Sequence, residues 1–228
     1  TIEPVLRDAG IAAFDAQVPL RVAPMHLFKA FSMCVEKAKG HHFPFALGDS
    51  FVFEHFAEFE TFLASCSTLR EMLEMASWAR ELLAPWLVVH LDEFGAEAHL
   101  RIEMRVPDPD PHALCHVREV ALSAINQLIR RATKGPRWLL SVRVASTPPS
   151  HHQQFTEHFG VPVFFGETAD ALVMDRRWLD MPLNDFVPEA HSQARQMIER
   201  RLSREVGERS LVDEVRWALE RRPELLRD

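Results

Sequence analysis

The stretch from Trp86 to Val106, WLVVHLDEFGAEAHLRIEMRV, decides the fold class of this chain. Residues 86–93 form an apolar run, and residues 97–106 alternate strictly between apolar and polar side chains. Because successive side chains of a strand point to opposite faces, the alternating segment has one apolar and one polar face. Gly95 lies between the two segments and allows a tight turn. The pattern therefore predicts a β-hairpin with one buried face.

Periodic patterns predict the elements on both sides of this hairpin. Before it, we predict helices at 24–39, 51–64 and 68–84, the last begun by a Thr68–Glu71 capping box, with a loop at 41–45. After it, we predict helices at 112–132, 150–159, 188–206 and 211–221, and strands at 138–145, 161–165 and 171–174.

This order of elements predicts an α+β fold. We expect a helical N-terminal half, an antiparallel-leaning sheet covered by helices, and two C-terminal helices. Residues 1–228 are expected to form one domain, with a helical part at about 1–84, a sheet-containing part at about 85–184 and the C-terminal helices at about 188–222. A chain of this length buries roughly 70% of its unfolded surface, so its core needs no disulfide or metal to hold it.

Charge and cysteine content narrow the function classes. The formal net charge is −7, whereas a domain that binds duplex DNA usually carries a basic face. Three widely spaced cysteines argue against a disulfide framework and for a reducing cytoplasm. The sequence has no run of the ~18 apolar residues that a membrane helix needs, and it opens on Thr1 without a secretory signal. We expect a cytoplasmic protein without a membrane partner, trimmed at its start, that does not bind DNA by itself.

Motifs for catalysis are missing from the sequence. It contains no G-x-S-x-G elbow, no Walker A loop and no G-x-G-x-x-G, so we expect no enzyme activity. The 12 histidines include the adjacent pairs His41–His42 and His151–His152. Neighbouring side chains of an extended loop point apart, and neither pair belongs to a zinc motif. We therefore predict surface or capping histidines and neither metal nor cofactor, with a haem- or metal-binding sensor as an alternative.

The aromatic content suggests where a ligand would bind. The chain has 16 Phe, 5 Trp and no Tyr, which suits either an aromatic core or an apolar cavity. We take residues 43–45, the 51–62 segment and the inner ends of the predicted strands as the places to find such a cavity. An arginine that reaches it could bind a carboxylate through two hydrogen bonds. The candidate ligand-binding residues are Phe43, Phe45, Phe56, His90, His99, Arg101 and Arg143.

An ordered set of short motifs points to a family. They are Leu47-Gly48, Ser65 through Leu73 (SCSTLREML), Phe155 through Gly166 and Leu179-Asp180-Met181-Pro182-Leu183. In this order they resemble the N-terminal effector domain of AraC/XylS-type bacterial transcription regulators, called the arabinose-binding domain. The chain departs from the family pattern at Met72, which replaces a small residue, and at Arg143, where the family often has histidine.

This resemblance implies a sensor. A small effector, apolar or acidic, would bind the domain, the domain would form a homodimer, and both would control a C-terminal helix-turn-helix domain that this sequence does not include. DNA would be contacted only through that missing domain, and the helix at 211–221 would be the coupling element. A dimerisation module without a small-molecule ligand remains the alternative.

Overall fold

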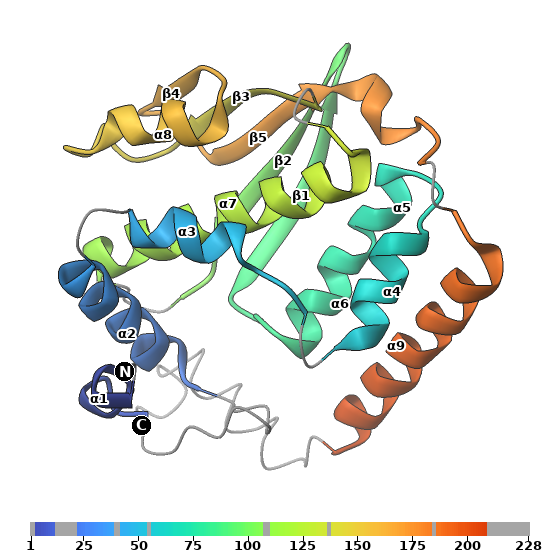
Figure 1. The fold of residues 1–228 in the computed structure, drawn as a ribbon, viewed down its shortest axis with the longest axis horizontal. Coiled ribbons are helices and arrows are strands. Elements are labelled where there is room, and N and C mark those ends of the chain that lie inside the picture. The colour runs from blue at the N-terminus through green and yellow to red at the C-terminus, as the bar shows by residue number, and fades with distance from the viewer. Residues whose placement is uncertain are drawn as a thin grey trace, which may run out of the picture.

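The computed structural model describes residues 3–11, 22–38, 42–53, 56–106, 110–135, 138–183 and 186–208 (Figure 1). Within these ranges, no helix is long and apolar enough to cross a membrane. The helices of the first half are α1 (Glu3–Asp8), α2 (Pro24–Lys37), α3 (Phe43–Asp49), α4 (Ala57–Ser65), α5 (Leu69–Leu73) and α6 (Met75–Leu82). They are followed by β1 (Leu87–Phe94), β2 (Glu97–Met104), α7 (Pro111–Thr133), β3 (Leu139–Val144), α8 (His152–Phe159), β4 (Val163–Phe165), β5 (Asp170–Asp175), the 3-10 helix η2 (Arg176–Leu179) and α9 (Pro188–Glu208).

The sheet has five strands in the order β1-β2-β5-β3-β4. All neighbours are antiparallel except β3 and β4, which are parallel and connected through α8. A parallel pair needs such a crossover, because its second strand must start again at the same end of the sheet. The predicted hairpin is β1–β2, and Gly95 turns it with a φ of +60°. The α+β prediction and its antiparallel-leaning sheet are confirmed.

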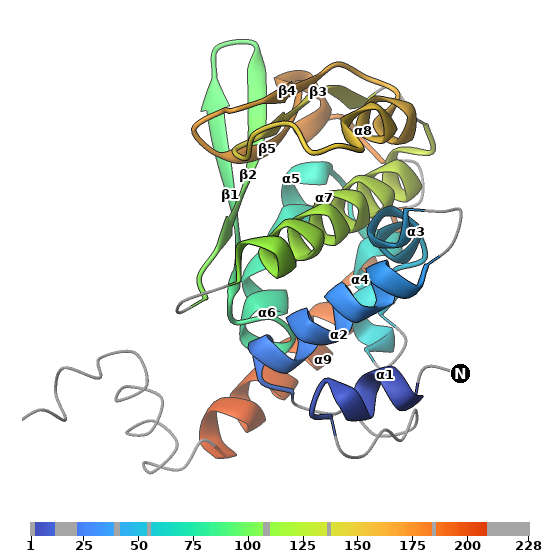
Figure 2. The same cartoon turned by 90° about the vertical axis from the view of Figure 1, so that its left-hand side faces the viewer.

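Helix α7 is the central element of the molecule. Figures 1 and 2 show it running between the sheet and the N-terminal helices, with α3 lying along it. Val117, Leu122 and Ile129 of α7 are fully or almost fully buried. Because α7 is covered on several sides, it also buries polar residues, which must then find partners.

The predicted loop at 41–45 is wrong from Phe43 onward, and the helix predicted at 51–64 is confirmed only from Ala57 onward. Helix α3 begins at Phe43, and Pro44 occupies its first turn, where a missing N–H costs nothing. Residues 51–53 are not helical, and the N–H of Phe53 binds Glu60 Oε1 at 2.9 Å, so the helix starts only at Ala57. The helix predicted at 68–84 is divided into α5 and α6 at Glu74. The predicted helix 211–221 lies outside the described residues.

The main core joins both halves of the chain. It contains Phe59, Phe62, Trp138 and Phe155, all at most 1% exposed. Helix α9 belongs to the same core, because Ile198 is fully buried and α9 lies beside α4 (Figure 1). The C-terminal part of the described chain is therefore packed on the helices that precede the sheet.

Candidate functional site

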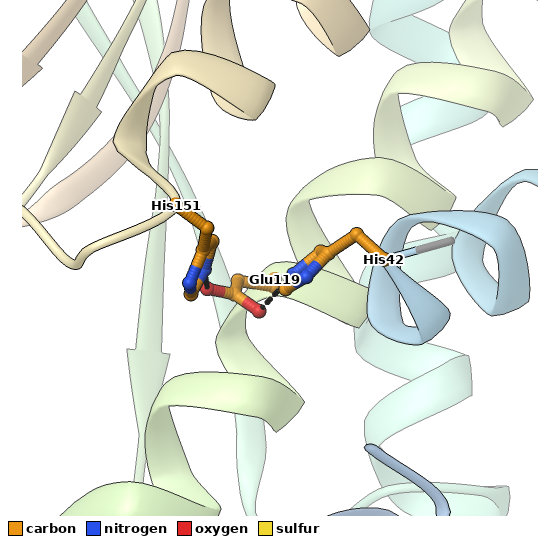
Figure 3. A group of neighbouring side chains, drawn as sticks. All are labelled: His42, Glu119 and His151. Atoms are coloured by element: carbon orange, nitrogen blue, oxygen red, sulfur yellow. Dashed lines mark hydrogen bonds and ion pairs between the residues drawn. The ribbon is translucent and has the colours of Figure 1, made fainter. Parts of the chain in front are cut away.

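The candidate site is built around Glu119, a carboxylate in the middle of α7 that is 0% exposed. Its Oε2 lies 2.7 Å from Nε2 of His42, and its Oε1 lies 2.8 Å from Nε2 of His151. Figure 3 shows the two imidazoles approaching the carboxylate, one from the start of α3 and one from the start of α8. Three segments far apart in the sequence therefore meet at one buried charge.

Aromatic packing fixes the two imidazoles. The His42 ring lies 4.5 Å from the Phe45 ring and 4.3 Å from the His151 ring, between centroids. His151 also stacks on Phe155 at 5.8 Å. Each ring is therefore held by aromatic neighbours as well as by Glu119.

Two further donors face the same carboxylate from α7 itself. Nδ1 of His116 and Sγ of Cys115 each lie 3.7 Å from a Glu119 oxygen, one helical turn before it. Burial raises the pKa of the Glu119 carboxyl, but His116, His42 and His151 outweigh burial and hold that pKa at about 2. Burial and the Glu119 charge together raise the pKa of the Cys115 thiol to about 11. At neutral pH the Glu119 carboxylate is thus ionised and the Cys115 thiol is protonated.

One turn further along α7, Ser123 forms a second polar group with His158 and Asp49. Ser123 Oγ lies 2.9 Å from Nε2 of His158 and 3.1 Å from Oδ1 of Asp49. In a catalytic triad the acid binds Nδ1 of the histidine, whereas here Asp49 approaches Nε2, at 3.7 Å. Ser123 is also 0% exposed. This group therefore ties α3, α7 and α8 together and does not have the geometry of an activated serine.

A small cavity of about 140 Å³ lies between α4 and α7. The ion pair between Glu60 and Arg131, at 2.7 Å, contributes its polar wall. The remaining lining residues are Leu63, Ala64, Cys66, Leu128, Ala132 and Leu183. An engineered apolar cavity of about 150 Å³ holds benzene, so this cavity has room for a compact ligand and not for a lipid.

The predicted ligand-binding residues lie in three places: beside the Glu119 group, between α4 and α9, and on the sheet. Phe45 is 4% exposed and stacks on His158 as well as on His42, while Phe43 is half-buried beside it. Phe56 packs on Phe59 and on the guanidinium of Arg201. These three aromatic residues therefore lie at two separate places.

The predicted polar ligands lie on the sheet. His90 contacts Glu103 at 3.0 Å, His99 contacts Glu97 at 3.1 Å and Arg101 contacts Asp92 at 2.9 Å, all on the polar face of the hairpin. Arg143 of β3 lies 3.8 Å from Glu167. The structure does not bring these four side chains to the cavity or to Glu119, and as ligand contacts they remain predictions.

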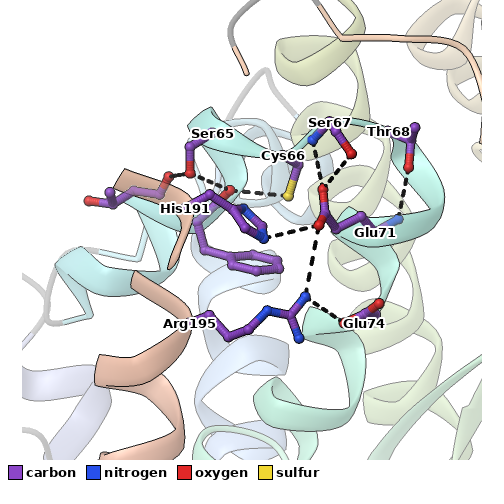
Figure 4. Close-up of polar contacts among 10 residues, drawn as sticks. Ser65, Cys66, Ser67, Thr68, Glu71, Glu74, His191 and Arg195 are labelled. Carbon is purple, nitrogen blue, oxygen red and sulfur yellow. Dashed lines mark hydrogen bonds and ion pairs between the residues drawn. The ribbon is translucent and has the colours of Figure 1, made fainter. Parts of the chain in front are cut away.

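A second group of metal-ligating residues lies where α5 meets α9. Cys66, Glu71 and His191 place one ligand atom each within 4.8 Å of one another. Figure 4 shows that Glu71 caps the start of α5, because its Oε2 accepts hydrogen bonds from the N–H and the hydroxyl of Ser67. The thiol of Cys66 donates to the carbonyl of Phe62, and its pKa is raised to about 12, chiefly by burial. This group is the cap of α5 and its link to α9.

Sequence reasoning missed Glu119 and assigned its two histidines to surface or capping roles. A signal was present, because Cys115, Glu119, Ser123 and Asn126 recur at helical spacing on α7. Such a stripe of potential hydrogen-bonding residues beside the apolar one indicates a second buried face. The partners of Glu119 carry no local signal, since they lie 77 and 32 residues away in the chain.

Comparison with known proteins decides the family. A model described as the arabinose-binding domain of AraC transcription regulators, N-terminal, matches residues 1–183. The chain belongs to this family. The crystal structure of the transcriptional regulator CdpR from Pseudomonas aeruginosa is similar to this arabinose-binding domain, with a TM-score of 0.66 and 15% identity.

That likeness covers 91% of this chain and 66% of the CdpR chain, so the chain spans just under two thirds of the regulator's length. At this identity the comparison shows a shared fold. No curated protein sequence matches the chain.

The motifs that carried the resemblance join distant parts of this arabinose-binding domain. Arg70 of the SCSTLREML motif contacts Asp180 of the Leu-Asp-x-Pro-Leu motif at 2.7 Å. Close by, the N–H of Leu183 donates to the carbonyl of Ser67 at 2.8 Å. Two of the motifs therefore meet at the start of α5, next to the segment that leads into α9.

Proposed function

We propose that this domain senses a small effector and controls, as a dimer, the DNA-binding domain of an AraC-type transcription regulator, without catalysing a reaction. Membership of the family supports the regulatory role. The observation that carries the ligand proposal is the cavity between α4 and α7, which combines apolar walls with the Glu60–Arg131 pair. Few polar groups on an otherwise apolar surface are typical of small-molecule sites.

The size and charge of the cavity define the effector that we propose. A volume of about 140 Å³ admits a compact body of roughly the size of a benzene ring. The guanidinium of Arg131 is a planar fork that matches a carboxylate. A small aromatic or branched aliphatic acid, whose carboxylate competes with Glu60 for Arg131, fits both features.

The position of the cavity suggests how binding is transmitted. Leu183 lines the cavity and lies a few residues before α9, which begins at Pro188. If α9 has two arrangements and the ligand contacts Leu183 better in one of them, binding shifts the equilibrium toward that arrangement. The size of the shift is set by the difference between the ligand's affinities for the two arrangements. Dimerisation and presentation of the DNA-binding domain would follow the position of α9.

Thermal melting with benzoate as the probe tests this proposal. We expect the melting temperature to rise with benzoate concentration, and the rise to vanish in Ala132→Phe, which fills the cavity. Ala57→Phe, on the exposed first turn of α4, is the matched control and keeps the rise. No rise with benzoate or with branched aliphatic acids, in a chain that native mass spectrometry shows as a dimer, would support a dimerisation module without a small-molecule ligand.

A further inference from the structure

The Glu119 group has the composition of a metal site. Two imidazole nitrogens and one carboxylate, from His42, His151 and Glu119, lie with their ligand atoms within 4.8 Å of one another. Imidazole and carboxylate together suit divalent first-row transition ions, and two histidines with one glutamate form a known zinc donor set. We propose that these three residues bind one divalent transition metal ion, for which Zn²⁺ is the probe.

The geometry needs only a small adjustment. Tetrahedral zinc with ligands at ~2.0–2.1 Å places its donor atoms about 3.3 Å apart. The two nitrogen–oxygen distances, 2.7 and 2.8 Å, would therefore lengthen by about half an ångström as the ion enters between the atoms. Each imidazole would keep its proton on Nδ1, so that Nε2 offers a lone pair to the ion.

Two further side chains that could ligate a metal ion lie close to Glu119, besides His42 and His151. His116 Nδ1 is buried, lies 3.7 Å from Glu119 and has no hydrogen-bond partner in the described part of the chain. Cys115 Sγ is at the same distance from the carboxylate. A fourth metal ligand is therefore available next to the site. If Glu119 had only a structural role, its contacts with His42 and His151 would be sufficient to pair both of its oxygens.

The site is also reachable and well supported. The side chains of His42 and His151 are 12% and 22% exposed, while Glu119 is only 1% exposed. An ion can thus enter from the histidine side and finish against the buried carboxylate. Since the ligands come from α7 and from the starts of α3 and α8, the bound ion would link these three elements (Figure 3).

The group at Cys66, Glu71 and His191 is the internal comparison. Glu71 is already used by Ser67, and the Cys66 thiol donates to a backbone carbonyl. Binding there would also bring a thiolate to the ion. A sulfur ligand gives cobalt(II) an intense near-ultraviolet charge-transfer band. Cys66→Ala therefore distinguishes the two groups, because a band from the Cys66 thiolate disappears in this variant, whereas a band from Cys115 at the Glu119 group does not.

The test is metal uptake by the whole chain. After equilibrium dialysis against Zn²⁺, elemental analysis is expected to find one ion per chain in the wild type. His42→Ala and His151→Ala each are expected to weaken binding by 10-fold or more, while His152→Ala, the exposed neighbour, leaves it unchanged. Circular dichroism of each variant shows that loss of binding is not loss of folding.

Three results would overturn the proposal. They are no uptake by the wild type, uptake unaffected by both His42→Ala and His151→Ala, and a cobalt(II) charge-transfer band that disappears in Cys66→Ala. The proposal does not depend on the effector proposed above, because the probe is Zn²⁺ alone and the cavity variant Ala132→Phe is expected to bind Zn²⁺ normally.

Discussion

Gly48 of α3 lies so close to Ser123 of α7 that a methyl group on Gly48 would come within 2.4 Å of the Ser123 Cβ. The same methyl group would lie 2.8 Å from the backbone oxygen of Val120. Backbone and Cβ atoms cannot move aside as the end of a flexible side chain can. The glycine of the Leu47-Gly48 motif is thus what lets α3 lie against α7 and places His42 beside Glu119.

We expect Gly48→Ala to destabilise the domain. Overpacking of a core contact costs about 1–3 kcal/mol, and the gain in helix propensity returns about 1 kcal/mol at most. Urea unfolding measures the net loss. Gly135→Ala is the control, because its nearest neighbour is 3.9 Å away, and it should be close to neutral. Equal stability of the two variants would show that the close contact does not constrain α3.

Acid should weaken the domain partly through Glu71. Burial raises the pKa of Glu71, but hydrogen bonds from Ser67 and the charges of His191 and Arg195 outweigh burial and lower the pKa below its usual value of 4.5. A carboxyl with a lowered folded pKa contributes stability above about pH 4.5, and this contribution is lost as the pH falls through the folded pKa. Glu71→Gln is expected to cost about 1 kcal/mol at pH 7 and progressively less below pH 4.5.

Urea unfolding between pH 7 and pH 3 tests that expectation. Glu157→Gln, on the exposed face of α8, is expected to follow the wild type at every pH. A difference between Glu71→Gln and wild type that stays constant down to pH 3 would contradict a role for the Glu71 charge.

The buried pair Arg118–Asp170 should be costly to break from one side. Arg118 Nε lies 2.5 Å from Asp170 Oδ2, and their side chains are 15% and 7% exposed. Asp170→Asn leaves the cation without a carboxylate and is expected to cost about 3–5 kcal/mol. The double variant with Arg118→Met should recover part of that loss, since no charge is then left buried.

The surface pair Arg177–Asp175 provides the control for Asp170→Asn. Its atoms are 2.6 Å apart, but Arg177 is 87% exposed, so Asp175→Asn should cost less than about 1 kcal/mol. If the double variant is no more stable than Asp170→Asn alone in urea unfolding, then the unpaired charge is not the cause of the loss.

Arg195 should hold α9 against the domain. Its guanidinium lies 5.5 Å from the Phe62 ring and 5.4 Å from the Trp78 ring, and it forms an ion pair with Glu74 at 2.8 Å. We expect Arg195→Ala to speed hydrogen exchange in α9 several-fold, with α7 unchanged. Arg200→Ala, on the exposed side of the same helix, is expected to leave exchange unaltered. If hydrogen exchange in α9 is the same in Arg195→Ala and Arg200→Ala, then Arg195 does not hold α9 against the domain.

Sequence patterns that each lie within one short segment were sufficient to predict most of the fold. The alternation in residues 97–106, Gly95 and the capping residues Thr68 and Glu71 predicted the hairpin and the start of α5, because each signal acts over a few residues. The errors are at residues 43–53, where the Phe-rich sequence predicts a loop and then a helix that begins too early, and at Glu74, where one predicted helix is divided. The contact of Glu60 with the Phe53 N–H determines where α4 begins.

The sequence by itself determined the fold class, the hairpin and the family, since periodicity, turn residues and ordered motifs act locally along the chain. Only the tertiary structure decided that one histidine from each adjacent pair faces Glu119 and that Arg131 borders a cavity. Those relations join segments up to 77 residues apart. They depend on how α3, α7 and α8 pack together, and no short-range pattern encodes that packing.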